Sequence, residues 1–136
     1  MKSDVTYSIG TENIDWDTLR QTLIADNWDN GRSAAQYRAS FENSFAVVTA
    51  RLGEEIIGTV RVLSDGVCNA YLVDVWTHSA HRRQGIATRM MEMALEKLPG
   101  QHVYLFTDEY ADFYAKLGFK VWETGMGKVV GKWLEG

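Results

Sequence analysis

The sequence predicts an α/β fold with one mixed β-sheet, which contains both antiparallel and parallel strands as in α+β proteins. Three strand-like runs, rich in β-branched and aromatic residues, follow one another in the middle of the chain, as in an antiparallel meander. A full helical run then separates the third of these from the next strand-like run, which allows parallel pairing through a right-handed crossover. The expected order is β-α-α-β-β-β-α-β-α-β-β, in a single domain that spans residues 1–136.

The N-terminal part is expected to form a strand, a helix, a loop and a second helix before the main sheet. Apolar residues recur at helical spacing in the first helix. The loop reads NWDNGR, and Asn, Asp and Gly favour turns. Ser33 can cap the second helix, in which Tyr37 and Phe41 lie four residues apart. The four elements are expected at residues 5–9, 15–25, 27–32 and 33–43.

The rest of the chain is expected to form six strands and two helices. The pair Gly53-Glu54 predicts a tight hairpin turn with glycine in its first position. One helix begins near Gly85, and Gly118 can end the other in a left-handed cap. The strands are expected at residues 45–52, 55–63, 70–77, 103–107, 120–123 and 128–133.

Composition and charge argue against several classes of protein. A chain with 46% hydrophobic and 24% charged residues is expected to fold, and a net charge of -4 without a basic stripe argues against a nucleic-acid partner. No apolar run approaches the roughly 18 residues that a membrane span needs, and the first ten residues lack a signal region. We therefore expect no membrane partner and a cytoplasmic location. Cys68 is the only cysteine, and no set of ligands completes a metal site around His78 and His81.

The segment RRQGIA, residues 82–87, has the features of an anion-binding turn. It lies between a strand-like run and the start of a helix, where unpaired amides and the helix dipole favour an anion. Gly85 would let the backbone approach that anion closely, and Arg82 and Arg83 add positive charge. The alternative is an ordinary glycine-containing turn whose arginines are only solvated.

The pattern Arg-x-x-Gly-x-Ala between a strand and a helix resembles the acyl-CoA pyrophosphate signature of the GNAT acetyltransferase superfamily. A second signature follows it in the expected order, since Phe113, Tyr114, Leu117, Gly118 and Phe119 match the family's Phe-Tyr-x-x-Leu-Gly-Phe element. The resemblance implies a GNAT-like acyl-CoA N-acyltransferase fold in which strands 4 and 5 splay apart. It also implies an acetyl-CoA-dependent N-acetyltransferase that moves an acetyl group directly to a primary amine of a small molecule or peptide.

In this family the backbone of strand 4 pairs with the pantetheine arm, and the turn after it holds the diphosphate. The resemblance therefore implies contacts with acetyl-CoA from strand 4, at Val75, Trp76 and Thr77, and from the turn, at Arg82, Arg83, Gln84, Gly85, Ile86, Ala87 and Thr88. Amides near the same bend could also bind the thioester oxygen. Arg83 and Thr77 depart from the usual pattern, but neither blocks a clamp made by the backbone.

The resemblance implies that Tyr114 donates a proton to the departing CoA thiolate. Phenol and alkyl thiol have comparable pKa values, which is the match that a general acid needs. The alternative for Tyr114 is a core tyrosine. A lysine-like acceptor amine must also lose its proton, which costs about 4 to 5 kcal/mol at pH 7. Candidate bases are Asp74, Glu109 and His78, and the alternative for each of them is a structural role.

The loop and second helix of this family usually close over the acceptor, which implies a pocket walled by Trp28, Asp29, Tyr37 and Phe41. The alternative is that the aromatic residues belong to the core. Two other functions stay open. One is a non-catalytic acyl-CoA-binding or regulatory domain. The other is a partner-binding domain whose tail strand, with Trp133 and Leu134, pairs with another subunit, an arrangement that would also suit a homodimer.

Overall fold

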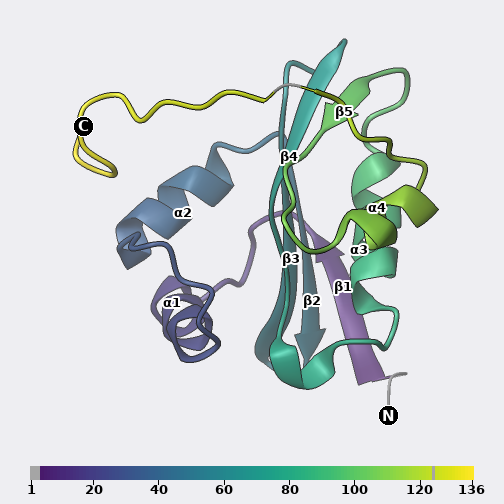
Figure 1. Ribbon diagram of the computed structural model, residues 1–136. Helices are drawn as coiled ribbons and strands as arrows, with labels where there is room; N and C mark the ends of the chain where they lie inside the picture. The colour runs from purple at the N-terminus through teal and green to yellow at the C-terminus, as the bar shows by residue number, and fades with distance from the viewer. Residues whose placement is uncertain (1–3, 124) are drawn as a thin grey trace. The chain divides into compact units, whose positions relative to one another are not determined.

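The computed structural model describes residues 4–123 and 125–136. It divides into two compact units, Met1–Leu105 and Phe106–Gly136, which are described separately below. The larger unit contains a five-stranded sheet with helices on both faces (Figure 1). Its elements are β1 (Val5–Ile9), α1 (Trp16–Ala25), α2 (Ala34–Glu42), β2 (Ala46–Leu52), β3 (Glu55–Ser64), β4 (Asn69–Thr77), a short 3-10 helix (Ser79–His81), α3 (Ile86–Leu95) and β5 (His102–Tyr104).

The strands lie in the order β1-β2-β3-β4-β5. The first four pair antiparallel in sequence order, and β5 pairs parallel to β4 after the crossover through α3. The hairpin between β2 and β3 turns at Gly53, whose φ of +63° explains the glycine there. The structure therefore confirms the predicted meander and the predicted parallel pair.

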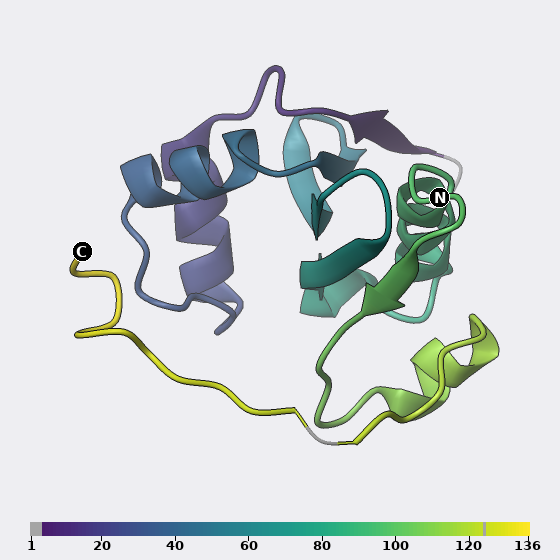
Figure 2. The same ribbon diagram turned by 90° about the horizontal axis from the view of Figure 1, so that it is seen from above.

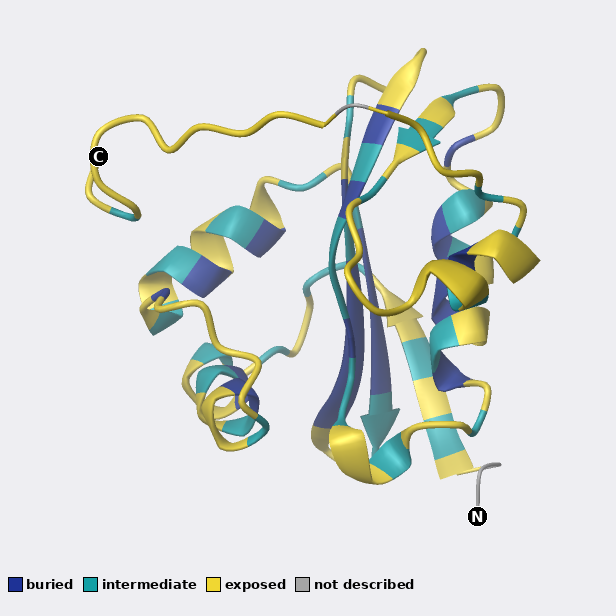
Figure 3. Cartoon of the chain, in the orientation of Figure 1, coloured by how far each residue is buried: buried dark blue, intermediate teal, exposed yellow. Residues whose placement is uncertain are grey.

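Helices cover both faces of this sheet. Helices α1 and α2 lie on one face and α3 lies on the other, as the two views agree (Figures 1 and 2). The core beneath α1 and α2 consists of Leu19, Leu23, Tyr37, Phe41, Val47, Ile56 and Trp76. On the opposite face, Met90 and Met91 of α3 are fully buried. Figure 3 shows that α3 has buried stretches along its length. A Cβ on Gly58 of β3 would lie 2.8 Å from Cε of Met90, so this close helix-on-sheet contact requires glycine.

The N-termini of α1 and α2 are both capped by side chains, and the cap of α2 at Ser33 is the one that the sequence predicts. The Asp15 side chain accepts a 3.0 Å hydrogen bond from the amide of Thr18. Ser33 and Gln36 form a capping box, in which each side chain accepts from the other residue's amide. The segment between the two helices is a loop, also as predicted.

Strands β4 and β5 pair over a short length only. Residues Asn69–Tyr71 face His102–Tyr104, and no strand of the described chain pairs with the rest of β4 on that side. The predicted splay is thus present, and β5 is shorter than the predicted strand at 103–107 because its partner strand diverges. A β-bulge adds to this divergence: Val73 faces Arg61 whereas Trp76 faces Thr59, so that two residues of β4 oppose one of β3.

The smaller unit contains one helix, α4 (Ala111–Lys116), followed by Gly118 at a φ of +94° as the predicted left-handed residue. The strands predicted at 120–123 and 128–133 are wrong. The described residues from 119 to 136 are irregular apart from one isolated bridge, Lys132 to Glu135. A strand needs a neighbour to satisfy its backbone, and the described residues of this unit offer none to these two segments, the second of which also contains Gly131. No helix within the described residues has the length and apolar character needed to span a bilayer.

Candidate functional site

The turn between β4 and α3 has the geometry of an anion-binding helix N-terminus. Gly85 occupies the N-cap position with φ +79° and makes no side-chain cap. Arg83 is also left-handed, with φ +63°. In the part of the chain that the structure describes, the amides of residues 86–88 donate to no backbone carbonyl. These donors and the positive end of the helix dipole therefore point toward whatever occupies the space ahead of α3.

The space in front of Gly85 is open. A Cβ built on Gly85 would have no heavy atom within 4 Å, apart from its chain neighbours. The next residue, Ile86, is buried and anchors the helix against the sheet, so it can offer only its backbone to a ligand. Ala87 is partly buried and Thr88 is exposed. A side chain at position 85 would thus extend into open space beside the start of α3.

Two arginines flank this turn and differ in their contacts. The Nε of Arg82 donates a 3.1 Å hydrogen bond to the carbonyl of Thr77, the last residue of β4. Arg83 is exposed, and Gln84 beside it is partly buried. Both guanidinium groups add positive charge where the helix dipole already favours an anion.

The three residues of β4 that are predicted to contact a cofactor differ in how far their side chains are buried. Trp76 is only 1% exposed and packs in the core under α1 and α2, so only its backbone is available. Val75 and Thr77 are partly buried. The hydroxyl of Thr77 is inaccessible and has no hydrogen-bond partner among the described residues. Because β5 has already ended, the edge of β4 along these residues can receive an added strand-like ligand.

Asp74 lies in the bulge of β4, with a φ of +52°. Its carbonyl accepts a 2.7 Å hydrogen bond from the hydroxyl of Thr59. One carboxylate oxygen accepts from Nε of Arg61 at 2.7 Å and from Arg32 at 3.1 Å, and the other accepts from Arg32 at 2.8 Å. All three charged side chains are nearly buried, with exposures of 7%, 9% and 12% for Arg32, Asp74 and Arg61. These hydrogen bonds favour a structural role for the Asp74 carboxylate, which would hold the bulge in place, over the role of a free base.

Arg32 and Arg61 are not among the site residues predicted from the sequence. Arg32 also donates to the side chains of Asn30 and Ser40, and its guanidinium lies 4.2 Å from the ring centroid of Tyr37. A signal for Arg61 was present, because it is the one charged residue in the interior of the β3 segment EIIGTVRVLS. A charged residue at such a position is almost always paired. The identity of its partner could not be read from the sequence.

A second carboxylate, that of Asp26 at the end of α1, lies near the first residues after β4. It accepts hydrogen bonds from the indole Nε1 of Trp76 at 3.0 Å, from the amide of Ser79 at 3.1 Å and from the Ser79 hydroxyl. Nδ1 of His78 lies 4.0 Å from the same carboxylate. Burial alone would raise the pKa of Asp26, but the hydrogen bonds from Ser79 and Trp76 together lower that pKa below its ordinary value of 3.8.

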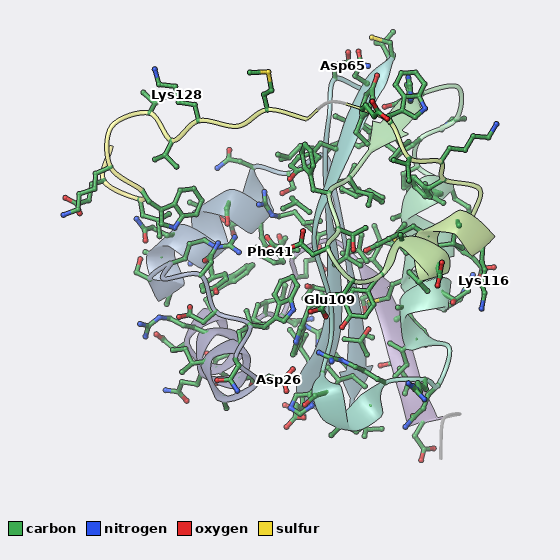
Figure 4. The ribbon with its side chains drawn as sticks, in the orientation of Figure 1. Asp26, Phe41, Asp65, Glu109, Lys116 and Lys128 are labelled. Atoms are coloured by element: carbon green, nitrogen blue, oxygen red, sulfur yellow. The ribbon has the colours of Figure 1, made fainter. Side chains whose placement is uncertain are left out.

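The residues predicted for an acceptor pocket fall into two groups. Trp28 and Asp29 are exposed in the loop between α1 and α2, with Trp28 37% exposed. Tyr37 and Phe41 are buried in the core, and Phe41 lies between α2 and the sheet (Figure 4). The hydroxyl of Tyr37 donates to the carboxylate of Asp29 at 3.2 Å, so one member of the core touches the loop. Burial raises the pKa of Tyr37.

Tyr114 and Glu109 both belong to the smaller unit. Tyr114 is 8% exposed, and its ring packs edge-on against Phe113 and Phe119 at centroid distances of 5.0 and 5.9 Å. Burial raises the pKa of its hydroxyl, with a smaller effect from Tyr110, so the phenol is protonated at neutral pH. Glu109 is exposed in the bend before α4 (Figure 4).

The splayed sheet and the glycine turn at the start of α3 agree with the fold that the two sequence signatures predict. A model of the Acetyltransferase (GNAT) family matches residues 11–119, so the chain belongs to the GNAT family of acetyltransferases. This match includes both sequence signatures, the turn at Gly85 and the element around Tyr114.

Solved structures share this fold. A GNAT family acetyltransferase from Streptococcus pneumoniae TIGR4 is 23% identical, with a TM-score of 0.78 over 94% of this chain and 99% of that chain. A transcriptional regulator from Bacillus halodurans C-125 is 28% identical, with a TM-score of 0.70 over 93% and 99%. An aminoglycoside acetyltransferase from an uncultured soil metagenomic sample is 20% identical, with a TM-score of 0.67 over 93% and 99%.

Proposed function

We propose that this protein is an acetyl-CoA-dependent N-acetyltransferase that moves an acetyl group directly to a primary amine of a small molecule or peptide. The observation that carries the proposal is the turn at Gly85. It combines unpartnered amides, an open approach and two arginines at the start of a helix beside a splayed strand. Such a turn suits the diphosphate of a CoA thioester.

The residues around the turn fit this co-substrate. The amides of residues 85–88 would hold the diphosphate, together with the charges of Arg82 and Arg83 and the side chain of Gln84. The backbone of Val75, Trp76 and Thr77 would pair with the pantetheine arm along the edge that β5 leaves open. Bound acetyl-CoA would supply an acetyl group already activated as a thioester. Amides near the bulge of β4 would donate hydrogen bonds to the thioester oxygen as it gains negative charge.

Tyr114 would act as the general acid. When the amine nitrogen attacks the carbonyl carbon and the carbon–sulfur bond breaks, the departing thiolate needs a proton. The Tyr114 phenol can donate it, because the group carries its proton at neutral pH. Glu109, which is exposed before α4, remains the carboxylate that we propose as the base for the amine.

The acceptor would be a cationic amine bound at the loop between α1 and α2. Trp28 is exposed there and could cover an alkyl or aromatic part of the acceptor, while Asp29 offers a carboxylate to its ammonium group. Tyr37 would support this site through its hydrogen bond to Asp29, and Phe41 would support it from the core. The structurally similar aminoglycoside acetyltransferase, named for an amine-rich acceptor, is in keeping with this class.

The test is transfer to a panel of amines. The purified protein is mixed with acetyl-CoA and polyamines, arylalkylamines, amino sugars, amino acids or short peptides, and release of free thiol is followed with a thiol reagent. We expect saturable, amine-dependent release with at least one class, together with an acetylated product of matching mass. Saturable acetyl-CoA binding without turnover on any amine would contradict the proposal.

That second outcome would instead support a non-catalytic acyl-CoA-binding domain. One observation favours this alternative: Asp74, a candidate base on β4, is already engaged by two arginines. A protein that keeps the turn at Gly85 but lacks an available base would bind the thioester without transferring its acetyl group.

A further inference from the structure

The bulge of β4 is held from three sides by residues that lie far from it in sequence. Thr59 of β3 holds the carbonyl of Asp74, and two guanidinium groups hold its carboxylate. A positive φ is uncommon for a non-glycine residue, and hydrogen bonds from the surroundings can fix a residue in that conformation. The hydrogen bonds to Asp74 provide that fixation, so they maintain the shape of the bulge.

The two arginines come from different parts of the larger unit. Arg61 extends from β3, the neighbouring strand, and its guanidinium lies 5.7 Å from the ring centroid of Phe41. Arg32 is the last residue before the cap of α2, in the loop that carries Trp28 and Asp29. One carboxylate therefore joins the bulge, the central sheet and this loop.

Arg32 is itself fixed within the loop. Its Nε donates to Asn30 at 2.9 Å, and one of its terminal nitrogens donates to Ser40 of α2 at 2.9 Å. Its backbone carbonyl accepts a 3.0 Å hydrogen bond from Nε of Arg20 on α1. Movement of the loop at Arg32 would therefore break contacts with both helices as well as the pair with Asp74.

We propose that Arg32, Asp74 and Arg61 are positioning residues that set the shape of the β4 bulge and couple it to the loop between α1 and α2. This inference rests on the proposed function, in which the amides near the bulge bind the thioester oxygen and the loop binds the acceptor. The three side chains touch neither reactant. They hold the two binding regions in fixed register, so that the amine and the thioester carbonyl meet at a productive distance.

The contacts of Asp74 fit a positioning residue better than a general base. Both oxygens of Asp74 accept hydrogen bonds from guanidinium groups, with three such bonds in total. Protonation of this carboxylate would disrupt two nearly buried ion pairs. A positioning carboxylate is expected to keep these hydrogen bonds throughout the reaction.

The main test is Asp74→Asn, because Asn has the same shape and also tolerates a positive φ. Its amide nitrogen cannot accept a hydrogen bond from a guanidinium, so the hydrogen bonds to one of the two carboxylate oxygens are lost. We expect kcat to fall at least about tenfold, while the KM for acetyl-CoA changes less than about threefold and the shape of the pH–rate profile is kept. The matched control is Glu42→Gln, which breaks the exposed ion pair with Arg38 and should change neither constant.

Arg61→Lys provides a second, milder variant. It keeps the positive charge but removes the Nε donor, and it should lose less activity than Arg61→Met. If circular dichroism shows that the Asp74→Asn protein is unfolded, the comparison of Arg61→Lys with Arg61→Met tests the positioning role instead. Equal activity of these two variants and the wild type would overturn the proposal.

Other outcomes also decide it. Loss of the acidic limb of the pH–rate profile in Asp74→Asn would identify Asp74 as a base and overturn the positioning role. An unchanged kcat in a folded Asp74→Asn protein would overturn the proposal while leaving the proposed function intact. If the wild type itself transfers no acetyl group to any amine, the proposed function fails and this inference fails with it.

Discussion

The indole nitrogen of Trp76 donates a 3.0 Å hydrogen bond to the carboxylate of Asp26, which joins the end of β4 to the end of α1. The same carboxylate holds Ser79, directly before the turn that leads to Gly85. Asp26 and Trp76, which are 50 positions apart in the sequence, are thus joined at the point where the proposed CoA site begins.

Asp26→Asn should destabilise the protein by about 1–3 kcal/mol at pH 7, because an amide cannot replace all the hydrogen bonds to the carboxylate. The pKa of Asp26 is lowered, so its contribution to stability is present above the ordinary pKa of 3.8 and is lost as pH falls through the lower, folded-state value. The difference between wild type and variant in urea unfolding should therefore shrink below pH 3.8. Glu12→Gln, at an exposed site, is the control. A difference that grows at low pH would contradict this assignment.

Tyr114→Phe should lower kcat about a hundredfold and leave acetyl-CoA affinity within about threefold of wild type. The variant keeps the buried ring and its packing on Phe113 and Phe119, and removes only the proton donor. Steady-state rates and calorimetric titration check the two parts separately. Tyr110→Phe, at an exposed tyrosine nearby in sequence, is the matched control. A rate that equals the wild-type rate from pH 6 to pH 10 would exclude Tyr114 as the acid.

Arg83→Gln should weaken acetyl-CoA binding about tenfold at low salt, because Arg83 is exposed in the turn and a charge-assisted contact with phosphate is lost. The difference should narrow at high salt as the charges are screened. Calorimetric titrations at two salt concentrations measure both effects. Arg38→Gln, on the exposed surface of α2, should bind like the wild type. An equal loss in the two variants would indicate that only net charge matters.

Gly58→Ala should destabilise the larger unit by about 1–3 kcal/mol, because the new methyl group would lie 2.8 Å from Cε of Met90 and 3.2 Å from the carbonyl of Trp76. Thermal unfolding measures the loss. The double variant with Met90→Ala should show non-additive stability, since the shorter side chain relieves one of the two contacts. Strict additivity would mean that Met90 is not the group that excludes a side chain at position 58.

The parts of this fold that local patterns determine could be predicted from the sequence. The cap at Ser33, the turn at Gly53 and the start of α3 after Gly85 all depend on residues close together in the chain. The predictions of terminal strands were wrong because a segment such as 128–133 forms a strand only where a neighbour pairs with it.

The residues that brace the site could not be predicted for the same reason. Arg32 and Asp74 are 42 residues apart, and nothing in either segment identifies the other as its partner. Asp74 was identified only as a carboxylate on strand 4, a description that suits a base as well as a brace. The distinction depends on which groups face its oxygens, and that depends on tertiary packing.

The central claim is that the backbone around Gly85 binds the diphosphate of acetyl-CoA. The most direct test is calorimetric titration of acetyl-CoA into the wild type, Gly85→Glu and Gly100→Glu. Gly100 is the matched control because it also has a positive φ, +75°, and open space at Cβ, but it lies between α3 and β5. We predict stoichiometric binding to the wild type and to folded Gly100→Glu, with no binding to Gly85→Glu. Binding of equal strength to all three proteins, or none to the wild type, would contradict the claim.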